Sequence, residues 1–100
     1  MKKRVLVLAC VSFCLPMSVY AMTYKEAHRL ADEAFFHKSI SSLKKLELSA
    51  SEGNKFAEYW LGIYFYSTQH YKQSVNWFRK AAERGIADAE NNLGVAYRYG

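Results

Sequence analysis

The feature that most constrains the fold of this chain is a pattern that occurs twice at a fixed offset in the sequence. Ala57, Leu61 and Gly62 recur as Ala89, Leu93 and Gly94, with the same separation for each pair. Self-similarity at such a period is typical of helical solenoids, in which each unit is a helix pair that buries its apolar face against its neighbours. We therefore expect an all-α fold, with helix-turn-helix repeats stacked as a short α-solenoid of about two and a half repeats.

The residues after position 21 favour helix almost throughout. They contain no proline and are rich in Ala, Leu, Glu and Lys, which are strong helix formers or common helix residues. Thr23 and Glu26 form a capping box, in which the hydroxyl accepts the Glu26 N–H and the carboxylate reaches back to Thr23. Ser39 and Asn54 are further N-cap residues, and Gly53 and Gly85 are glycines of the kind that end helices. The expected helices run from Thr23 to about His37, from Ser39 to Gly53, from Asn54 to about Ser67, from Tyr71 to Gly85, and from Asp88 onward.

The apolar residues of four of these helices recur at helical spacing, which predicts a core. The expected core residues are Ala27, Leu30, Ala31, Ala34 and Phe35, then Ile40, Leu43, Leu46 and Ala50, then Tyr71, Val75, Phe78, Ala81 and Ala82, then Ala89, Leu93 and Tyr97. The helix from Asn54 to Ser67 is apolar or aromatic on almost every side, so we expect it to be covered on more than one side and to lie in the middle. Small residues such as Gly62, Ala81, Ala82 and Gly94 are expected to let helix axes approach closely.

Residues 1–21 have the pattern of an export signal. Lys2, Lys3 and Arg4 precede an apolar run from Val5 to Leu15, and Val19 to Ala21 form a small-residue cleavage site. The apolar run is shorter than the roughly 20 residues that span a bilayer. We expect cleavage after Ala21, a periplasmic or secreted location, and no stable membrane span in the processed chain.

Processing also changes the composition of the chain. Cys10 and Cys14 lie within the signal, so the processed protein has no disulfide. An alternative is a lipidation box of residues 7–10 ending at Cys10, although apolar residues continue beyond it to Leu15. The net charge of +5 falls to about +2 once the three basic residues at the start leave. No basic stripe remains, which argues against nucleic-acid binding.

The repeated residues resemble the Sel1-like repeat, a relative of the tetratricopeptide repeat. The block K-A-A-x-x-G-x-x-x-A-x-x-x-L-G is met at every fixed position from Lys80 to Gly94. The full set that matches is Ala57, Leu61, Gly62, Phe65, Trp77, Lys80, Ala81, Ala82, Gly85, Ala89, Leu93, Gly94, Tyr97 and Gly100. Phe65 stands where the family prefers Tyr, and the loop between the helices of this repeat lacks the family's glycines. The resemblance assigns residues 54–100 to repeats and leaves residues 22–53 as a divergent N-terminal helix pair.

Residues for catalysis or metal binding do not occur in suitable patterns. His28, His37 and His70 are not at ligand spacing, and His28 with Asp32 fits a surface pair on one helix. No Gly-x-Ser-x-Gly is present, and both cysteines leave with the signal. Most carboxylates fall on faces that we expect to be solvated, while Glu58 and Glu90 recur at the repeat period and suggest a structural role. We expect no enzyme activity, catalytic residue, cofactor or metal.

The resemblance implies a site of another kind. In tetratricopeptide-like arrays the first helix of each pair lines a concave groove that binds another protein or a peptide segment. Transferring the groove positions to this sequence selects Ala27, Ala31 and Phe35, then Tyr59, Ile63 and Tyr66, then Asn91, Val95, Arg98 and Tyr99. The alternative for Tyr59 and Tyr66 is that they pack between neighbouring helices. Tyr and Trp are common in binding hot spots, which favours the groove for the set.

Three functions are compatible with such a groove. The first is a periplasmic adaptor or scaffold that binds a partner protein through a concave aromatic surface. The second is an immunity or inhibitor protein that neutralises a secreted toxin, and the third, with less support, is a cell-envelope hydrolase. The apolar residues Leu93, Val95 and Tyr97 predict further repeats, self-association through the last helix, or shielding of that helix by a partner.

Overall fold

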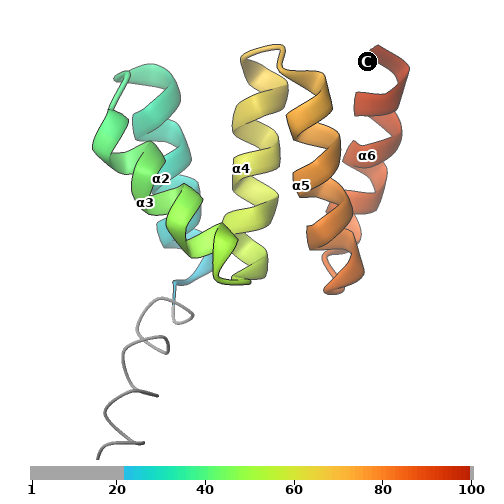
Figure 1. The fold of residues 1–100 in the computed structure, drawn as a ribbon, viewed down its shortest axis with the longest axis horizontal. Coiled ribbons are helices and arrows are strands. Elements are labelled where there is room, and N and C mark those ends of the chain that lie inside the picture. The colour runs from blue at the N-terminus through green and yellow to red at the C-terminus, as the bar shows by residue number, and fades with distance from the viewer. Residues whose placement is uncertain (1–21, 100) are drawn as a thin grey trace, which may run out of the picture.

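The computed structural model describes residues 22–99 and contains five helices and no strand in that part of the chain. The expected export signal, residues 1–21, and Gly100 lie outside the described residues. The helices are α2 (Tyr24–Phe36), α3 (Ile40–Ser51), α4 (Lys55–Ser67), α5 (Tyr71–Glu83) and α6 (Ala87–Tyr99). Figure 1 shows α4 in the middle, with α2 and α3 together on one side of it and α5 and then α6 on the other. The all-α solenoid is thus confirmed.

The caps predicted from the sequence set the first three helix starts. Thr23 Oγ1 accepts from the Glu26 N–H at 3.1 Å, Ser39 Oγ accepts from Ser42 at 3.2 Å, and Asn54 Oδ1 accepts from Ala57 at 2.9 Å. Gly53 and Gly85 follow the ends of α3 and α5 with φ of 98° and 96°, which glycine adopts without strain. Of the two capping-box contacts, the structure shows the one to the Thr23 hydroxyl, and the Glu26 carboxylate accepts from Arg29 Nη2 at 3.2 Å.

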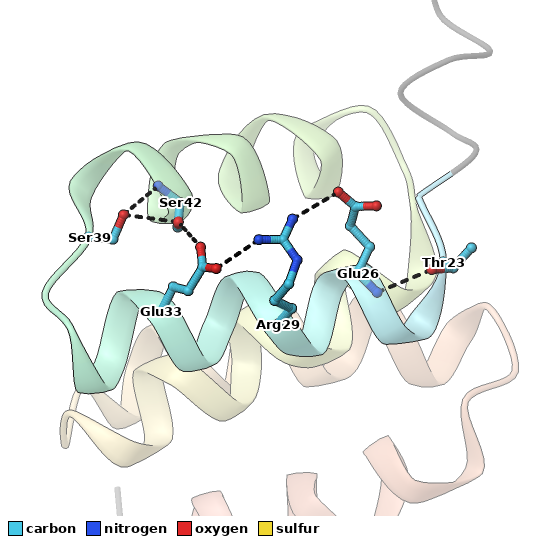
Figure 2. Close-up of polar contacts among 6 residues, drawn as sticks. All are labelled: Thr23, Glu26, Arg29, Glu33, Ser39 and Ser42. Carbon is cyan, nitrogen blue, oxygen red and sulfur yellow. Dashed lines mark hydrogen bonds and ion pairs between the residues drawn. The ribbon is translucent and has the colours of Figure 1, made fainter.

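A polar network joins α2 to α3, and Figure 2 shows its residues. Ser39 Oγ donates to Ser42 Oγ at 2.9 Å, and Ser42 Oγ donates to Glu33 Oε1 at 2.6 Å. Arg29 Nη1 donates to the other carboxylate oxygen of Glu33 at 2.7 Å. The hydrogen bond from Ser42, with that from Arg29, lowers the pKa of Glu33. The network fixes how the divergent helix pair folds back on itself.

The core forms two clusters that meet at α4. One is built on α2, α3 and α4, and the other on α4, α5 and α6. Leu61 is 0% exposed in the first cluster and Phe78 is 1% exposed in the second. The central place of α4 follows from its apolar residues on nearly every side, as expected from the sequence.

Gly62 is a position of close contact between α4 and α5. A Cβ atom at Gly62 would lie 2.6 Å from Cδ1 of the Phe78 ring, so only glycine fits there without a shift. The carbonyl oxygen of Gly62 also accepts a hydrogen bond from Ser74 Oγ at 3.0 Å, and Ser74 is fully buried. The predicted role of Gly62 in close helix packing is confirmed. The same prediction is wrong for Gly94, which is exposed and where an added Cβ atom would meet nothing within 4 Å, because no described helix covers that face of α6.

Two burial predictions are wrong. Ile40 is 68% exposed, because at the first turn of α3 the buried position belongs to Ser42, whose hydroxyl bonds to Glu33. Tyr97 is 57% exposed, because α6 packs through the small residue Ala96 instead. Glu58, for which the repeat period suggested a structural role, is 1% exposed and paired with Arg84.

Candidate functional site

An open groove lies between α4 and α6 and has a volume of about 110 Å³. Its lining residues are Ile63, Tyr66, Phe78, Asn92 and Val95. Ile63, Tyr66 and Val95 are groove positions selected from the sequence, and the structure brings these three together from α4 and α6. They are half-buried, so each keeps part of its surface accessible. We call this space the α4–α6 groove.

Tyr59 lies beneath this surface and contributes to the core. It is 7% exposed, its ring packs against Phe78 with ring centres 6.1 Å apart, and its hydroxyl accepts from Asn92 Nδ2 at 3.3 Å. Burial raises the pKa of the Tyr59 phenol. In this position Tyr59 couples α4 to α6 and is covered by protein, as in the packing alternative that the sequence left open.

A tyrosine cluster borders the α4–α6 groove. The Tyr66 ring lies edge-on to Tyr71 and to Tyr99, at centre distances of 5.5 and 6.3 Å, and Tyr71 stacks on Tyr99 at 6.1 Å. Tyr99, a predicted groove residue, is largely exposed and extends the aromatic surface of Tyr66. The cluster gives the groove a rim with both apolar rings and hydroxyl groups, which suits protein recognition.

The remaining predicted groove residues lie elsewhere on the surface or in the core. Asn91 and Arg98 are exposed on α6 without lining the groove. Phe35 is half-buried on α2, where its ring is edge-on to Phe36 at 5.0 Å. Ala27 and Ala31 are buried in the first core cluster.

Aromatic side chains occupy the surface between α2 and α4. His28 stacks on Trp60 with ring centres 4.1 Å apart and planes 9° apart, and Tyr24 stacks on Tyr59 at 6.2 Å. His28 also pairs with Asp32 across one helical turn, Nε2 to Oδ2 at 3.3 Å, as expected. The predicted concave surface is therefore filled by rings at its α2 end and open at its α6 end.

Sequence reasoning missed three residues of this site: Tyr71, Phe78 and Asn92. Phe78 was assigned to the core and serves both as core and as groove floor. Asn92 occupies the position in its repeat that Trp60 occupies in the preceding one, and the sequence shows this difference as a polar residue in an aromatic position. Replacing a large ring with a small amide leaves space, which is the signal that could have located the groove.

An ion pair with one buried member, Glu58, lies outside the groove, between α4 and the residue that follows α5. Arg84 Nε donates to both carboxylate oxygens of Glu58, at 3.0 and 3.1 Å, while the Arg84 side chain remains half exposed. Removal from water raises the pKa of Glu58, and the hydrogen bond and charge of Arg84 oppose that effect. The pair fastens the end of α5 onto α4. This role agrees with the structural one expected from the repeat spacing.

Residues 22–99 hold no group of three His, Cys, Asp or Glu side chains arranged for a metal ion. Over the same residues, no helix combines the length and the apolar character that crossing a bilayer requires.

Comparison with known proteins gives a partial match. A sel1-like repeat-containing protein of Acanthamoeba polyphaga mimivirus is 47% identical over 38 residues, which is 38% of this chain. The match spans only 7% of that relative's own length. No family model and no solved structure matches the chain. Over this segment the chain is similar to a Sel1-like repeat protein, in agreement with the resemblance read from the repeated residues.

Proposed function

We propose that this protein is an exported interaction module, acting as a periplasmic adaptor or scaffold, that binds a segment of a partner protein in the α4–α6 groove. The observation that carries the proposal is the convergence of Ile63, Tyr66 and Val95 from two helices on one open space. The exposed Tyr99 adds a ring at the rim. The export signal pattern of residues 1–21 supports the location.

The chemistry of the groove favours an apolar or aromatic anchor on the partner. Ile63, Phe78 and Val95 supply apolar walls, and Asn92 supplies an amide next to them. A volume of about 110 Å³ suits one medium-sized side chain rather than a cofactor. A partner segment would therefore place one apolar residue in the groove and lie along the tyrosine rim.

Site-specific crosslinking tests this proposal. A photoreactive amino acid at Val95 should capture a partner from periplasmic extract, whereas the same residue at Ile40, which is exposed on α3, serves as the control. Tyr66→Ala should reduce capture at Val95 at least tenfold, and Phe36→Ala, which removes an exposed ring on α2, should leave it unchanged. Equal capture by the wild type and Tyr66→Ala would overturn the proposal.

The same experiment separates an adaptor from an inhibitor. An adaptor should yield several crosslinked partners that dissociate readily before crosslinking. A dedicated inhibitor of a toxin should yield one partner in a tight complex, and expression of this protein should then protect cells from that toxin.

A further inference from the structure

The α2–α4 interface and the α4–α6 interface carry side chains of different size at the same repeat positions. On α2 these positions hold alanines, Ala31 and Ala34, which are both 4% exposed. One repeat later they hold Ile63 and Tyr66 on α4, which are half-buried and line the α4–α6 groove. The small residues of α2 are thus covered, whereas the larger residues of α4 keep part of their surface accessible.

The side chain that comes from the next helix changes in the opposite direction. Trp60 of α4 packs against the first core cluster, which includes Ala31, and its ring stacks on His28. The counterpart of Trp60 on α6 is Asn92, whose Nδ2 donates to the Tyr59 hydroxyl at 3.3 Å. An amide is smaller than an indole ring. The α4–α6 interface therefore keeps an open space of about 110 Å³.

We propose that Asn92 determines which anchor residue the α4–α6 groove accepts, and that this anchor is an aliphatic side chain of about the size of leucine. This inference rests on the proposed function, because it names the chemistry of the partner segment that the groove binds. Asn92 is then the specificity-determining residue of the groove. A larger side chain at this position closes the groove, and a smaller one enlarges it.

The size of the groove favours an aliphatic anchor over an aromatic one. An apolar cavity of about 150 Å³ holds one benzene ring, and the α4–α6 groove measures about 110 Å³. A phenylalanine or tryptophan ring would therefore leave part of its surface outside the groove. A leucine side chain would bury its apolar surface against Ile63, Phe78 and Val95.

The lining of the groove also selects against a charged anchor. None of the five side chains that line it carries a charge, and the burial of an unpaired charge is costly. Tyr59, which is 7% exposed, holds the Asn92 amide through its hydroxyl. The width of the groove at Asn92 is thus set by the folded protein and does not depend on the ligand.

Two small probes test the size limit on the protein itself. The probes are N-acetyl-leucine amide and N-acetyl-tryptophan amide, and the readout is the side-chain amide signal of Asn92 in nuclear magnetic resonance spectra. We expect the leucine probe to shift this signal in a saturable manner and the tryptophan probe to bind at least about tenfold more weakly. The side-chain amide of Asn91, which is exposed and outside the groove lining, is the internal control and should not shift.

Variants at two neighbouring positions of α6 test the role of Asn92 in partner binding. A photoreactive amino acid at Tyr99, on the rim, leaves all five lining residues in place and reports capture of a partner from periplasmic extract. Asn92→Trp should reduce this capture at least about tenfold, because the ring fills the groove. Asn91→Trp adds the same ring at an exposed position outside the lining and should leave capture unchanged. Asn92→Ala should strengthen binding of the tryptophan probe, measured on the main-chain amide of Val95.

The outcomes separate this inference from the proposed function. The inference would be overturned by the absence of a shift with either probe, by equal binding of the two probes, or by capture that Asn92→Trp leaves unchanged while Tyr66→Ala reduces it. The proposed function would be overturned by the absence of capture from the wild type at both Tyr99 and Val95. In that case a shift of the Asn92 signal by the leucine probe alone would still support the size limit.

Discussion

The helices α4 and α6 carry the same repeated residues in opposite environments. On α4, Glu58 and Gly62 are buried under α5, whereas on α6 their counterparts Glu90 and Gly94 are exposed. The residues are the same, but only α4 has a described helix over that face. The comparison shows that the repeated residues mark the side of a helix against which another helix can pack. Their burial depends on what covers them.

The largest expected effect concerns the leucine of the repeat. Leu61→Ala removes a side chain that is 0% exposed in the first core cluster, and we expect it to lower the free energy of unfolding by about 2 to 5 kcal/mol. For a domain of this size that is enough to abolish cooperative melting. Leu93→Ala, at the half-buried counterpart on α6, should cost clearly less. Circular dichroism melting curves measure both, and equal losses would contradict the difference between the two helices.

Replacing the two repeated glycines, Gly62 and Gly94, with alanine should change stability in opposite directions. Gly62→Ala places a Cβ 2.6 Å from the Phe78 ring, which is 1% exposed and would have to shift, so we expect a loss of about 1 to 3 kcal/mol. Gly94→Ala meets nothing within 4 Å and should raise stability by up to about 1 kcal/mol, because alanine favours helix over glycine.

Chemical denaturation of both variants tests this contrast. Phe78→Leu in the Gly62→Ala background supplies a control, since a smaller side chain should recover part of the loss. A destabilising Gly94→Ala, or a neutral Gly62→Ala, would show that the two glycines are not in the environments described here.

The buried carboxylate of Glu58 and the exposed carboxylate of Glu90 should contribute differently to the pH dependence of stability. Burial raises the pKa of Glu58 in the folded protein above its unfolded value. As pH rises from the unfolded pKa through the raised folded pKa, the unfolded chain loses its proton first, so stability falls. Glu58→Gln removes the pH-dependent contribution of this carboxylate. The stability of the variant relative to the wild type should therefore increase from about pH 4 to pH 7. Denaturation at a series of pH values measures this trend, with Glu90→Gln as the exposed control, and a constant offset between Glu58→Gln and the wild type would contradict it.

Much of the fold could be predicted because its determinants are local. The hydroxyl and amide caps at Thr23, Ser39 and Asn54 act within one helical turn, and the repeat period fixes how the helices stack. The groove was predicted in part, since Ile63 and Val95 recur at the repeat period.

What could not be predicted depends on which neighbour each side chain meets. Tyr59 was assigned to the groove, but whether it faces a partner or the core depends on Asn92, a residue of another helix. Ile40 and Tyr97 follow the helical spacing of a core yet point where no described helix covers them. Periodicity identifies a face of a helix, whereas burial requires a second surface.

The smallest expected effect concerns the aromatic position of the repeat. Tyr97 is 57% exposed and its hydroxyl accepts from Arg79 Nη2 at 3.0 Å, so Tyr97→Phe removes one exposed hydrogen bond and should change stability by less than about 0.5 kcal/mol. Tyr97→Ala should also be tolerated, whereas Phe65→Ala, at the same position on α4, removes a ring that packs against the first core cluster and should cost more. Denaturation of the three variants side by side tests this ranking. If Tyr97→Ala proved as costly as Phe65→Ala, the face of α6 that carries Tyr97 would be covered in solution, contrary to its 57% exposure.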